Sequence, residues 1–205
     1  MNTIDKLAVI GNSGHALDIR STFLKINPKA SVVCIEKQKE ESLIQKYSQE
    51  GYKFIIGVGD NQVRYKLVKK YKYLKWCSVI SPSCSIGDST NIGLGTFLNS
   101  GVFISHHVSI GNHSIVNANS SIGHDTVIED FCQICTNVSI GGKGVQVKLG
   151  SFLGSNTVVK NKRNLIIGEW SQVSLGSVIS KNISKKKLFM QILKDIQLPI
   201  ITRTK

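Results

Sequence analysis

Between Ile80 and Ile140 an aliphatic residue occupies every sixth position, and this period restricts the fold more than any other feature of the chain. The members are Ile80, Ile86, Ile92, Leu98, Ile104, Ile110, Val116, Ile122, Ile128, Ile134 and Ile140. A small or β-branched residue, such as Thr96 or Ser114, follows nearly every member four residues later. A six-residue repeat is typical of a parallel β-helix, in which three short strands complete each coil. The stacked aliphatic residues are then expected to form the core.

The period is interrupted after Ile140. We expect the aliphatic register to resume at Leu149 and then to continue through Ser155 and Asn161 as imperfect members and through Ile167, Val173 and Ile179. The segment 141–146 is therefore predicted to leave the helix as a short loop. Insertions in repeat proteins often lie on the binding face.

Residues 1–76 show a different pattern, in which apolar runs alternate with amphipathic segments. The expected strands and helices, in chain order, are residues 7–10, 16–26, 31–35, 39–49, 53–60 and 61–72. This alternation predicts a parallel sheet covered by helices. Ligands of such sheets bind beyond the carboxyl ends of the strands, which here are residues 11–15, 36–37 and 57–61.

The turn Gly11-Asn12-Ser13-Gly14-His15 contains only part of the glycine fingerprint of dinucleotide sites. A strand-to-helix turn of small residues can still present backbone N–H groups to a phosphate. The two glycines could equally do no more than form a tight turn. The residues alone leave both interpretations open.

His106 and His124 are 18 residues apart, so they should occupy the same place on successive coils, with Gly142 next in that column. Asp125 follows His124, and a carboxylate beside an imidazole can fix its tautomer and stabilise the imidazolium. We predict that His124 is a general base and that Asp125 orients it. The other histidines of the repeat are interpreted as solvated turn residues.

Cys132 and Cys135 have the spacing of a metal or redox pair, but the repeat places Cys132 inward and Cys135 on the next face. We therefore predict no bound metal. The odd total of five cysteines argues against a disulfide framework and for a reducing compartment. The predicted location is the cytoplasm.

The net charge of +13 comes mainly from scattered lysines without interleaved aromatic residues, so we predict no nucleic-acid binding. No apolar run approaches the roughly 20 residues of a membrane span, and none is predicted. Residues 185–196 are expected to form an amphipathic helix that covers the last coil, because an exposed end of a repeat stack needs a cap.

Several motifs occur together in this chain: Gly11-Asn12-Ser13-Gly14-His15, Gly57-Val58-Gly59-Asp60-Asn61 with Arg64, Ser81-Pro82-Ser83, Gly123-His124-Asp125 and the six-residue repeat. In combination they resemble bacterial sugar acyltransferases related to sialic acid O-acetyltransferases and to nucleotide-4-amino-sugar N-acetyltransferases. The resemblance implies an α/β Rossmann-like nucleotide-sugar domain (1–76) and a left-handed parallel β-helix (77–184). We expect a C-terminal capping helix and tail over residues 185–205.

The resemblance also implies roles for individual residues. His124 and Asp125 are the catalytic pair. The nucleotide-sugar contacts are Asn12, Ser13, Gly14, His15, Glu36, Lys37, Gly59, Asp60, Asn61 and Arg64. The acetyl-CoA contacts are Gln133, where several members carry a second histidine, Gly142 and Gly154. Members are homotrimers, and acetyl-CoA lies between neighbouring β-helices.

The predicted function is acetyl-CoA-dependent N-acetylation of the 4-amino group of a UDP- or dTDP-linked amino-deoxy sugar for surface polysaccharide synthesis. His124 would take a proton from the amine as it attacks the thioester, and a backbone N–H such as that of Gly142 would face the oxyanion. Three alternatives stay open. They are O-acetylation of sialic acid or a related sugar, a zinc hydratase like gamma-type carbonic anhydrases that uses His106, His107 and His124, and a non-catalytic sugar sensor.

Overall fold

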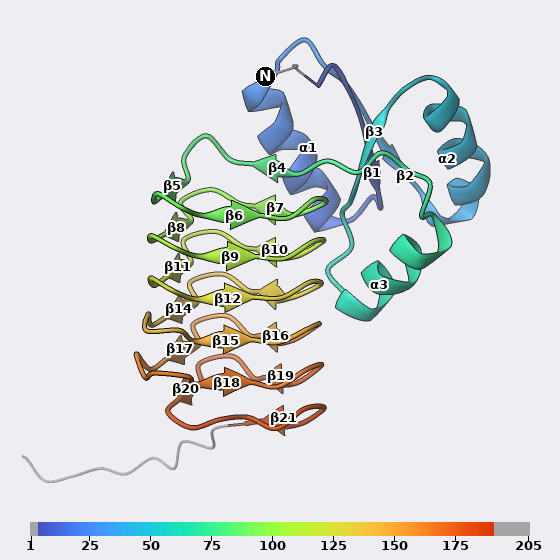
Figure 1. The fold of residues 1–205 in the computed structure, drawn as a ribbon. Helices are drawn as coiled ribbons and strands as arrows, with labels where there is room; N and C mark the ends of the chain where they lie inside the picture. Colours follow the sequence, from blue (N-terminus) through green and yellow to red (C-terminus); the bar gives the residue numbers. More distant parts are fainter. Residues whose placement is uncertain (1–3, 191–205) are drawn as a thin grey trace, which may run out of the picture.

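An α/β part precedes a stack of triangular coils in the computed structural model, which describes residues 4–190 (Figure 1). The strands and helices of the α/β part are β1 (Lys6–Ile10), α1 (Gly14–Ile26), β2 (Ser31–Ile35), η1 (Lys37–Lys39), α2 (Glu40–Gln49), β3 (Lys53–Ile56) and α3 (Asn61–Lys70). The strands are parallel in the order β2-β1-β3. The predicted alternation of strands and helices is therefore confirmed.

The apolar runs form strands because the sheet is covered on both faces. Every residue from Leu7 to Ile10 is at most 1% exposed, as are residues 54–56 of β3. Strand β3 ends before the predicted end at Asp60, since residues 57–60 form the turn into α3. A glycine is required at position 57 in this turn, because a Cβ there would lie 2.6 Å from the Cα of Ala16 in α1.

The coils form a left-handed parallel β-helix with three flat faces, as predicted. Face one consists of β4 (Val79–Ile80), β7 (Phe97–Leu98), β10 (Ile115–Val116), β13 (Gln133–Ile134), β16 (Phe152–Leu153), β19 (Gln172–Val173) and β21 (Leu188–Phe189). Face two consists of β5 (Ser85–Ile86), β8 (Phe103–Ile104), β11 (Ser121–Ile122), β14 (Ser139–Ile140), β17 (Val158–Val159) and β20 (Val178–Ile179). Face three consists of β6 (Asn91–Ile92), β9 (Ser109–Ile110), β12 (Val127–Ile128), β15 (Gln146–Val147) and β18 (Ile166–Ile167).

The second residue of each short strand points into the prism. From Leu98 to Ile179 all of these inward residues are at most 2% exposed. The small or β-branched residues predicted four positions after each aliphatic one are also buried from Thr96 to Val138. Their hydroxyl groups satisfy carbonyls inside the stack: Thr96 Oγ1 donates to Gly111 O at 2.8 Å and Ser114 Oγ to Glu129 O at 3.0 Å. The hexapeptide period therefore describes the core correctly from Leu98 to Ile140, whereas on the first coil Ile80 and Ile92 are partly buried and Ile86 is 40% exposed.

Between Ile140 and Ile167 the predicted register is wrong, whereas the predicted inward positions of Ile167, Val173 and Ile179 are confirmed. The inward residues of the intervening stretch are Val147, Leu153 and Val159, whereas Leu149 and Ser155 are half-buried and Asn161 is exposed. The interval from Ile140 to Val147 has one residue more than six, and that from Val159 to Ile167 has two more. The sum of these two insertions equals the single shift of three residues inferred from the sequence. Both insertions lie at the corner between face two and face three.

The predicted C-terminal helix is also wrong where the structure describes it. Residues 185–187 form a turn, and Leu188 and Phe189 form β21, which pairs in parallel with β19. The residues after 190, which include the rest of the predicted helix, lie outside the described residues. The last described strand thus extends the coil instead of capping it. Among residues 4–190, no helix is both long enough and apolar enough to cross a bilayer.

Candidate functional site

His124 and Asp125 form a close pair at the corner between β11 and β12. Nδ1 of His124 lies 2.7 Å from Oδ2 of Asp125, and the two side chains are 49% and 52% exposed. The hydrogen bond to His124 and the charge of the imidazole lower the pKa of Asp125. The ionised carboxylate accepts the Nδ1 proton, so the Nε2 lone pair of neutral His124 is free to accept a proton.

The column predicted from the repeat is present around this pair. A Cβ on Gly142, one coil further, would lie 2.7 Å from Cδ2 and 2.9 Å from Nε2 of His124, so the imidazole covers the glycine. His107 approaches the other carboxylate oxygen of Asp125 with Nδ1 at 3.5 Å. Nδ1 of His106 accepts a hydrogen bond from the backbone N–H of Asp88. His106 and His107 are both exposed at turns, as predicted. His113 was interpreted in the same way, but it is 5% exposed, because its turn is covered by the α/β part through Arg64 and Trp76.

A cavity of about 670 Å³ opens beside Asp125, and we name it the Asp125 cavity. Its lining residues are Asp125, Lys143, Gly144, Asn161, Arg163 and Asn164. All of them except Asp125 come from the two insertions, which stack at this corner. The side chains of Lys143 and Arg163 suit an anionic ligand. Asn161, Arg163 and Asn164 were not predicted to line a site, because the sequence suggests one insertion where the structure has two.

A second cavity, the glycine-turn cavity, lies at the carboxyl ends of β1 and β2 and measures about 660 Å³. Its lining includes Asn12, Ser13 and Lys37 among the predicted contacts. The other lining residues are Ile10, Gly11, Ile35, Gln38, Glu40, Glu41, Val58, Val63, Leu67 and Lys70. Ser13 precedes α1 without capping it through its side chain, and no acidic residue occupies the first turn of that helix. Backbone N–H groups at the start of α1 are therefore available to an anion.

Arg64 does not lie in the glycine-turn cavity, although it was predicted to contact the nucleotide sugar. It is 1% exposed and joins the two parts of the molecule. Its Nε donates to His113 O, and its Nη atoms donate to Val58 O, Gly59 O, Gln133 Oε1, Phe131 O and Cys132 O, at 2.8–3.1 Å. All five guanidinium N–H groups are used in this way, so none is left for a ligand. Burial lowers the pKa of Arg64 to about 10, and the side chain still carries its charge at neutral pH.

Two neighbours of Arg64 also have structural contacts. Asp60 caps α3, since its Oδ1 accepts from the N–H groups of Gln62 and Val63 at 2.8 and 3.0 Å. Asn61 is 9% exposed, and its amide donates to Gly150 O on the coils. The local sequence Asp60-Asn61 thus starts a helix and attaches it to the β-helix. Glu36 and Gly14 are exposed and lie close in sequence to the glycine-turn cavity without lining it.

Gln133 and Gly154 differ from their predicted roles as acetyl-CoA contacts. Gln133 is 2% exposed, with its amide between Arg64 and His15. Its side chain is covered by the α/β part, which the sequence could not show. Gly154 is buried at the end of β16, and a Cβ there would lie 2.5 Å from Leu175 N, so close packing of successive coils explains this glycine.

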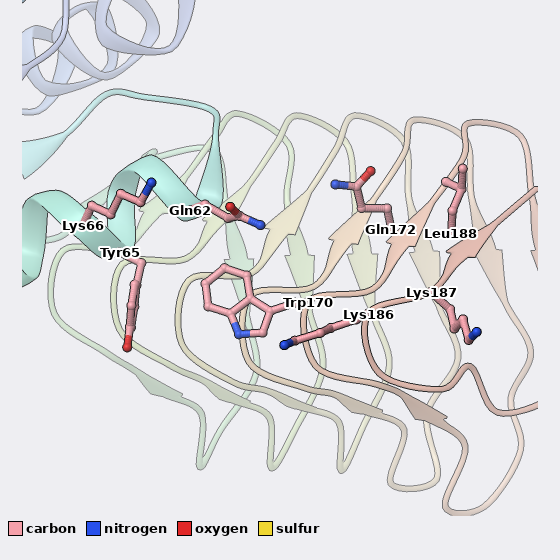
Figure 2. Close-up of a pocket in the computed structure, with 8 residues that line it drawn as sticks. All are labelled: Gln62, Tyr65, Lys66, Trp170, Gln172, Lys186, Lys187 and Leu188. Carbon is pink, nitrogen blue, oxygen red and sulfur yellow. The ribbon is translucent and has the colours of Figure 1, made fainter.

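A third cavity, the α3 cavity, lies between α3 and the last coils and measures about 690 Å³ (Figure 2). Its lining residues are Gln62, Tyr65, Lys66, Trp170, Gln172, Lys186, Lys187 and Leu188. Figure 2 shows Tyr65 and Lys66 on α3 and the other aromatic ring, Trp170, on the coils. The rings of Tyr65 and Trp170 meet edge to face with centroids 5.5 Å apart. Three lysines and no acidic side chain among the lining residues give this cavity a positive charge.

The buried thiols are poor nucleophiles at neutral pH. Burial raises the pKa of Cys132 to about 12 and that of Cys135 to about 11. The Sγ of Cys132 lies inside the prism, 3.2 Å from Lys148 O. Within residues 4–190, no group of three or more His, Cys, Asp or Glu side chains is placed to hold a metal ion.

The two halves of the predicted site lie on different sides of the prism. His124 is at the corner between face two and face three, whereas Arg64 and Gln133 attach the α/β part to face one and its corner with face three. Figure 1 shows the α/β part beside β4 and β7, away from the corner between β11 and β12. One copy of the chain therefore places the α/β part, with its glycine-turn cavity, and the His124–Asp125 pair on different sides of the prism.

Comparisons with known proteins agree with the resemblance drawn from the sequence. Residues 6–71 match the family model described as the PglD N-terminal domain. The acetyltransferase domain of PglB from Neisseria gonorrhoeae FA1090 has a TM-score of 0.79 and 20% identity, covering 87% of this chain and 93% of that one. A variant of perosamine N-acetyltransferase from Caulobacter crescentus, in complex with CoA and GDP-perosamine, has a TM-score of 0.82 and 22% identity, covering 91% and 93%.

WeeI from Acinetobacter baumannii AYE is similar as well, with a TM-score of 0.69 and 21% identity over 89% of this chain and 95% of that one. At these identities the likeness concerns the fold. It extends over both the α/β part and the coils, because each of these three structures covers at least 87% of the chain. The arrangement of an α/β part before a β-helix is thus shared with these three structures, which include a perosamine N-acetyltransferase.

Proposed function

We propose that this chain is an acetyl-CoA-dependent N-acetyltransferase that acts on the 4-amino group of a nucleoside diphosphate-linked sugar. The observation that carries the proposal is the exposed His124–Asp125 pair, with Nδ1 and Oδ2 2.7 Å apart, at the edge of a cationic cavity. The structural neighbours support this proposal. One of them was solved with CoA and GDP-perosamine, and another with acetyl coenzyme A.

The reaction proposed for this geometry is direct transfer. Nε2 of His124 accepts a proton from the sugar amine while the amine nitrogen attacks the thioester carbonyl carbon. The resulting tetrahedral intermediate collapses with cleavage of the C–S bond, and the imidazolium returns its proton to the departing thiolate. Asp125 stabilises the transient imidazolium through its contact with Nδ1.

We further propose that each active site is built from two copies of the chain, in a homotrimer. The catalytic corner of one copy would face the α/β part of its neighbour, because within one copy these regions lie on different sides of the prism. Closed cyclic assemblies repeat one such heterologous contact around the ring. The nucleotide sugar would bind at the glycine-turn cavity, with its phosphates near the start of α1 and near Lys37 and Lys70.

The two other cavities suggest where acetyl-CoA lies. The Asp125 cavity extends from the catalytic pair toward the later coils, and the α3 cavity extends from the α/β part in the same direction along the stack. In the proposed trimer the Asp125 cavity of one copy and the α3 cavity of the next would form opposite walls of one groove. Lys143 and Arg163 on one wall and the three lysines of the α3 cavity on the other would neutralise the phosphates of the coenzyme.

The experiment is an assay with purified protein, labelled acetyl-CoA and a panel of UDP-, dTDP- and GDP-linked 4-amino sugars, with sialic acid as a hydroxyl acceptor. We expect N-acetylation of at least one nucleotide-linked amino sugar. His124→Ala should lower kcat by about 10²–10⁴-fold, the usual contribution of a general base. Acetylation of sialic acid alone would replace this proposal with the O-acetyltransferase. Full activity of His124→Ala would remove the assigned base.

A further inference from the structure

A buried relay of side chains connects the two parts of the molecule at His15. Arg64 Nη1 donates to Gln133 Oε1 at 3.0 Å, and Gln133 Nε2 lies 3.2 Å from Nε2 of His15. Arg64 and Gln133 are 1% and 2% exposed, so water does not compete for these contacts. The relay starts on α3, passes through β13 of the coils, and ends in the first turn of α1.

Arg64 determines which end of the Gln133 amide faces His15. A guanidinium can only donate hydrogen bonds, so the amide atom beside Arg64 must be the oxygen. The NH₂ group of Gln133 then points to His15. The two ends of an amide have nearly the same shape, so shape cannot distinguish the oxygen from the nitrogen. The assignment rests instead on the donors and acceptors that the neighbouring groups offer.

The amide in turn determines the protonation of His15. An NH₂ group donates, so Nε2 of His15 must be the nitrogen without a proton. The proton of the neutral ring is therefore on Nδ1. In the described part of the chain Nε2 is the ring nitrogen of His15 that has a hydrogen-bond partner, and the half-buried ring lies two residues after Ser13, which lines the glycine-turn cavity. Burial and the nearby charge of Arg64 lower the pKa of His15, against a raising effect of Asp18, which agrees with a neutral ring.

We propose that Gln133, oriented by Arg64, is a positioning residue that fixes His15 in its Nδ1–H tautomer and so presents a hydrogen-bond donor to an oxygen of the nucleotide sugar. This inference rests on the proposed function, which supplies the ligand. It gives the buried Gln133 an indirect role in binding the sugar substrate, through His15, instead of the predicted contact with acetyl-CoA. Gly59 supports the arrangement, because a Cβ at that position would lie 3.3 Å from Nε2 of His15.

Gln133→Glu is the most informative variant. It preserves the shape of the side chain and keeps an oxygen acceptor for Arg64, but it replaces the donor that faces His15 with a second acceptor. The His15 ring must then carry a proton on Nε2, either as the other tautomer or as imidazolium. The matched control is Gln146→Glu, which makes the same change on β15 of face three, away from the relay.

Nitrogen-15 NMR of histidine-labelled protein distinguishes protonated from unprotonated ring nitrogens and needs no substrate. We expect Nδ1–H for His15 in the wild-type protein and in Gln146→Glu, and a protonated Nε2 in Gln133→Glu. In the assay, Gln133→Glu should raise KM for the nucleotide sugar about tenfold and leave KM for acetyl-CoA unchanged. Gln146→Glu should change neither constant.

Each result bears on the proposal separately. A wild-type His15 that carries its proton on Nε2, or that exchanges between tautomers, would overturn the inference whether or not the protein transfers acetyl groups. An inverted tautomer in Gln133→Glu without a change in KM for the sugar would overturn the positioning role. If no sugar of the panel is acetylated, the proposed function fails, while the NMR result still decides the tautomer.

Discussion

The His124 ring occupies the space that a side chain at position 142 would fill, so its position depends on the glycine there. The three atoms nearest to a Cβ at Gly142 would all belong to that ring, the closest at 2.7 Å. Gly142→Ala should therefore displace the imidazole and leave the coil intact. We expect kcat for acetyl transfer to fall at least about tenfold, since small misplacements of a catalytic group have large effects on rate.

A double variant provides the control. In a His124→Ala background, Gly142→Ala should cause no further loss of kcat, because the group that it displaces is already absent. The midpoint of thermal unfolding should change little in either background. A loss of kcat that adds fully to that of His124→Ala would mean that Gly142 acts by another route, such as its backbone N–H.

His113 makes the stability of the protein sensitive to acid. It is 5% exposed, its ring stacks on Phe131 with centroids 5.4 Å apart, and its Nδ1 is buried without a hydrogen-bond partner in the described structure. Burial lowers its pKa to about 4 from 6.5, although Asp130 opposes the shift. Between these values the unfolded chain binds a proton that the folded chain excludes. The free energy of unfolding should therefore fall as the pH drops from about 6.5 to 4, by up to about 3 kcal/mol.

His113→Phe retains the aromatic stack and removes the titration. Urea unfolding at a series of pH values should give a flatter acid slope for this variant than for the wild-type protein. A smaller slope should remain, because the pKa of His15 is also lowered by burial. If the two proteins lose stability in parallel below pH 6.5, His113 is not the group responsible.

At the scale of the elements, the two insertions create a binding surface that the regular coils lack. They stack at the corner of His124 and place Lys143 and Arg163 around one cavity. If that cavity holds phosphates of acetyl-CoA, Arg163→Ala should raise KM for acetyl-CoA several-fold and change kcat little, since the contact is remote from the reacting atoms. KM for the sugar should be unaffected.

Lys160→Ala is the matched control, because Lys160 is exposed within the same insertion but does not line the cavity. It removes one positive charge from the same corner. Equal increases in KM for the two variants would indicate a general electrostatic attraction of the coenzyme. An increase specific to Arg163→Ala would indicate direct contact.

The same corner shows where prediction from the sequence succeeds and where it stops. The pair His124–Asp125 and the glycine below it could be placed from the period alone, because residues 18 apart share a column. Two insertions of one and two residues cannot be distinguished from one insertion of three by register alone, since both restore the same phase afterwards. Arg163 was therefore missed, and the inward role of Val147 with it.

At the scale of the molecule, the contact between the two parts could not be predicted. The sequence predicts the strands and helices of the α/β part because their apolar periods are local. That α3 would pack on face one depends on long-range contacts, such as those of Arg64 with His113 and Phe131. Arg64 and Asn61 were consequently assigned to a ligand, whereas their buried donors satisfy carbonyls of the coils. A polar motif near a glycine turn is thus compatible with either role until the packing is known.

The separation of the two half-sites leads to a complementation test of the proposed assembly. His124→Ala removes the catalytic half. Ser13→Glu should disable the other half, because it adds a negative charge at the start of α1, where the phosphates are proposed to bind, and Ser13 is exposed enough to accept the larger side chain. Each variant alone should be nearly inactive. Trimers assembled from equal amounts of both, isolated through two different affinity tags, should recover activity.

The size of the recovery follows from the composition of the mixed trimers. A site is intact when one chain has kept His124 and its neighbour has kept Ser13, which occurs at one of the three sites in every trimer that contains both variants. The isolated mixed trimers should therefore reach about a third of the wild-type kcat per chain, with the wild-type KM for both substrates. If each site lay within a single chain, every chain would carry one disabled half and mixing would restore nothing. Inactive mixed trimers would therefore contradict the shared site and would place the catalytic pair and the glycine turn in the same copy.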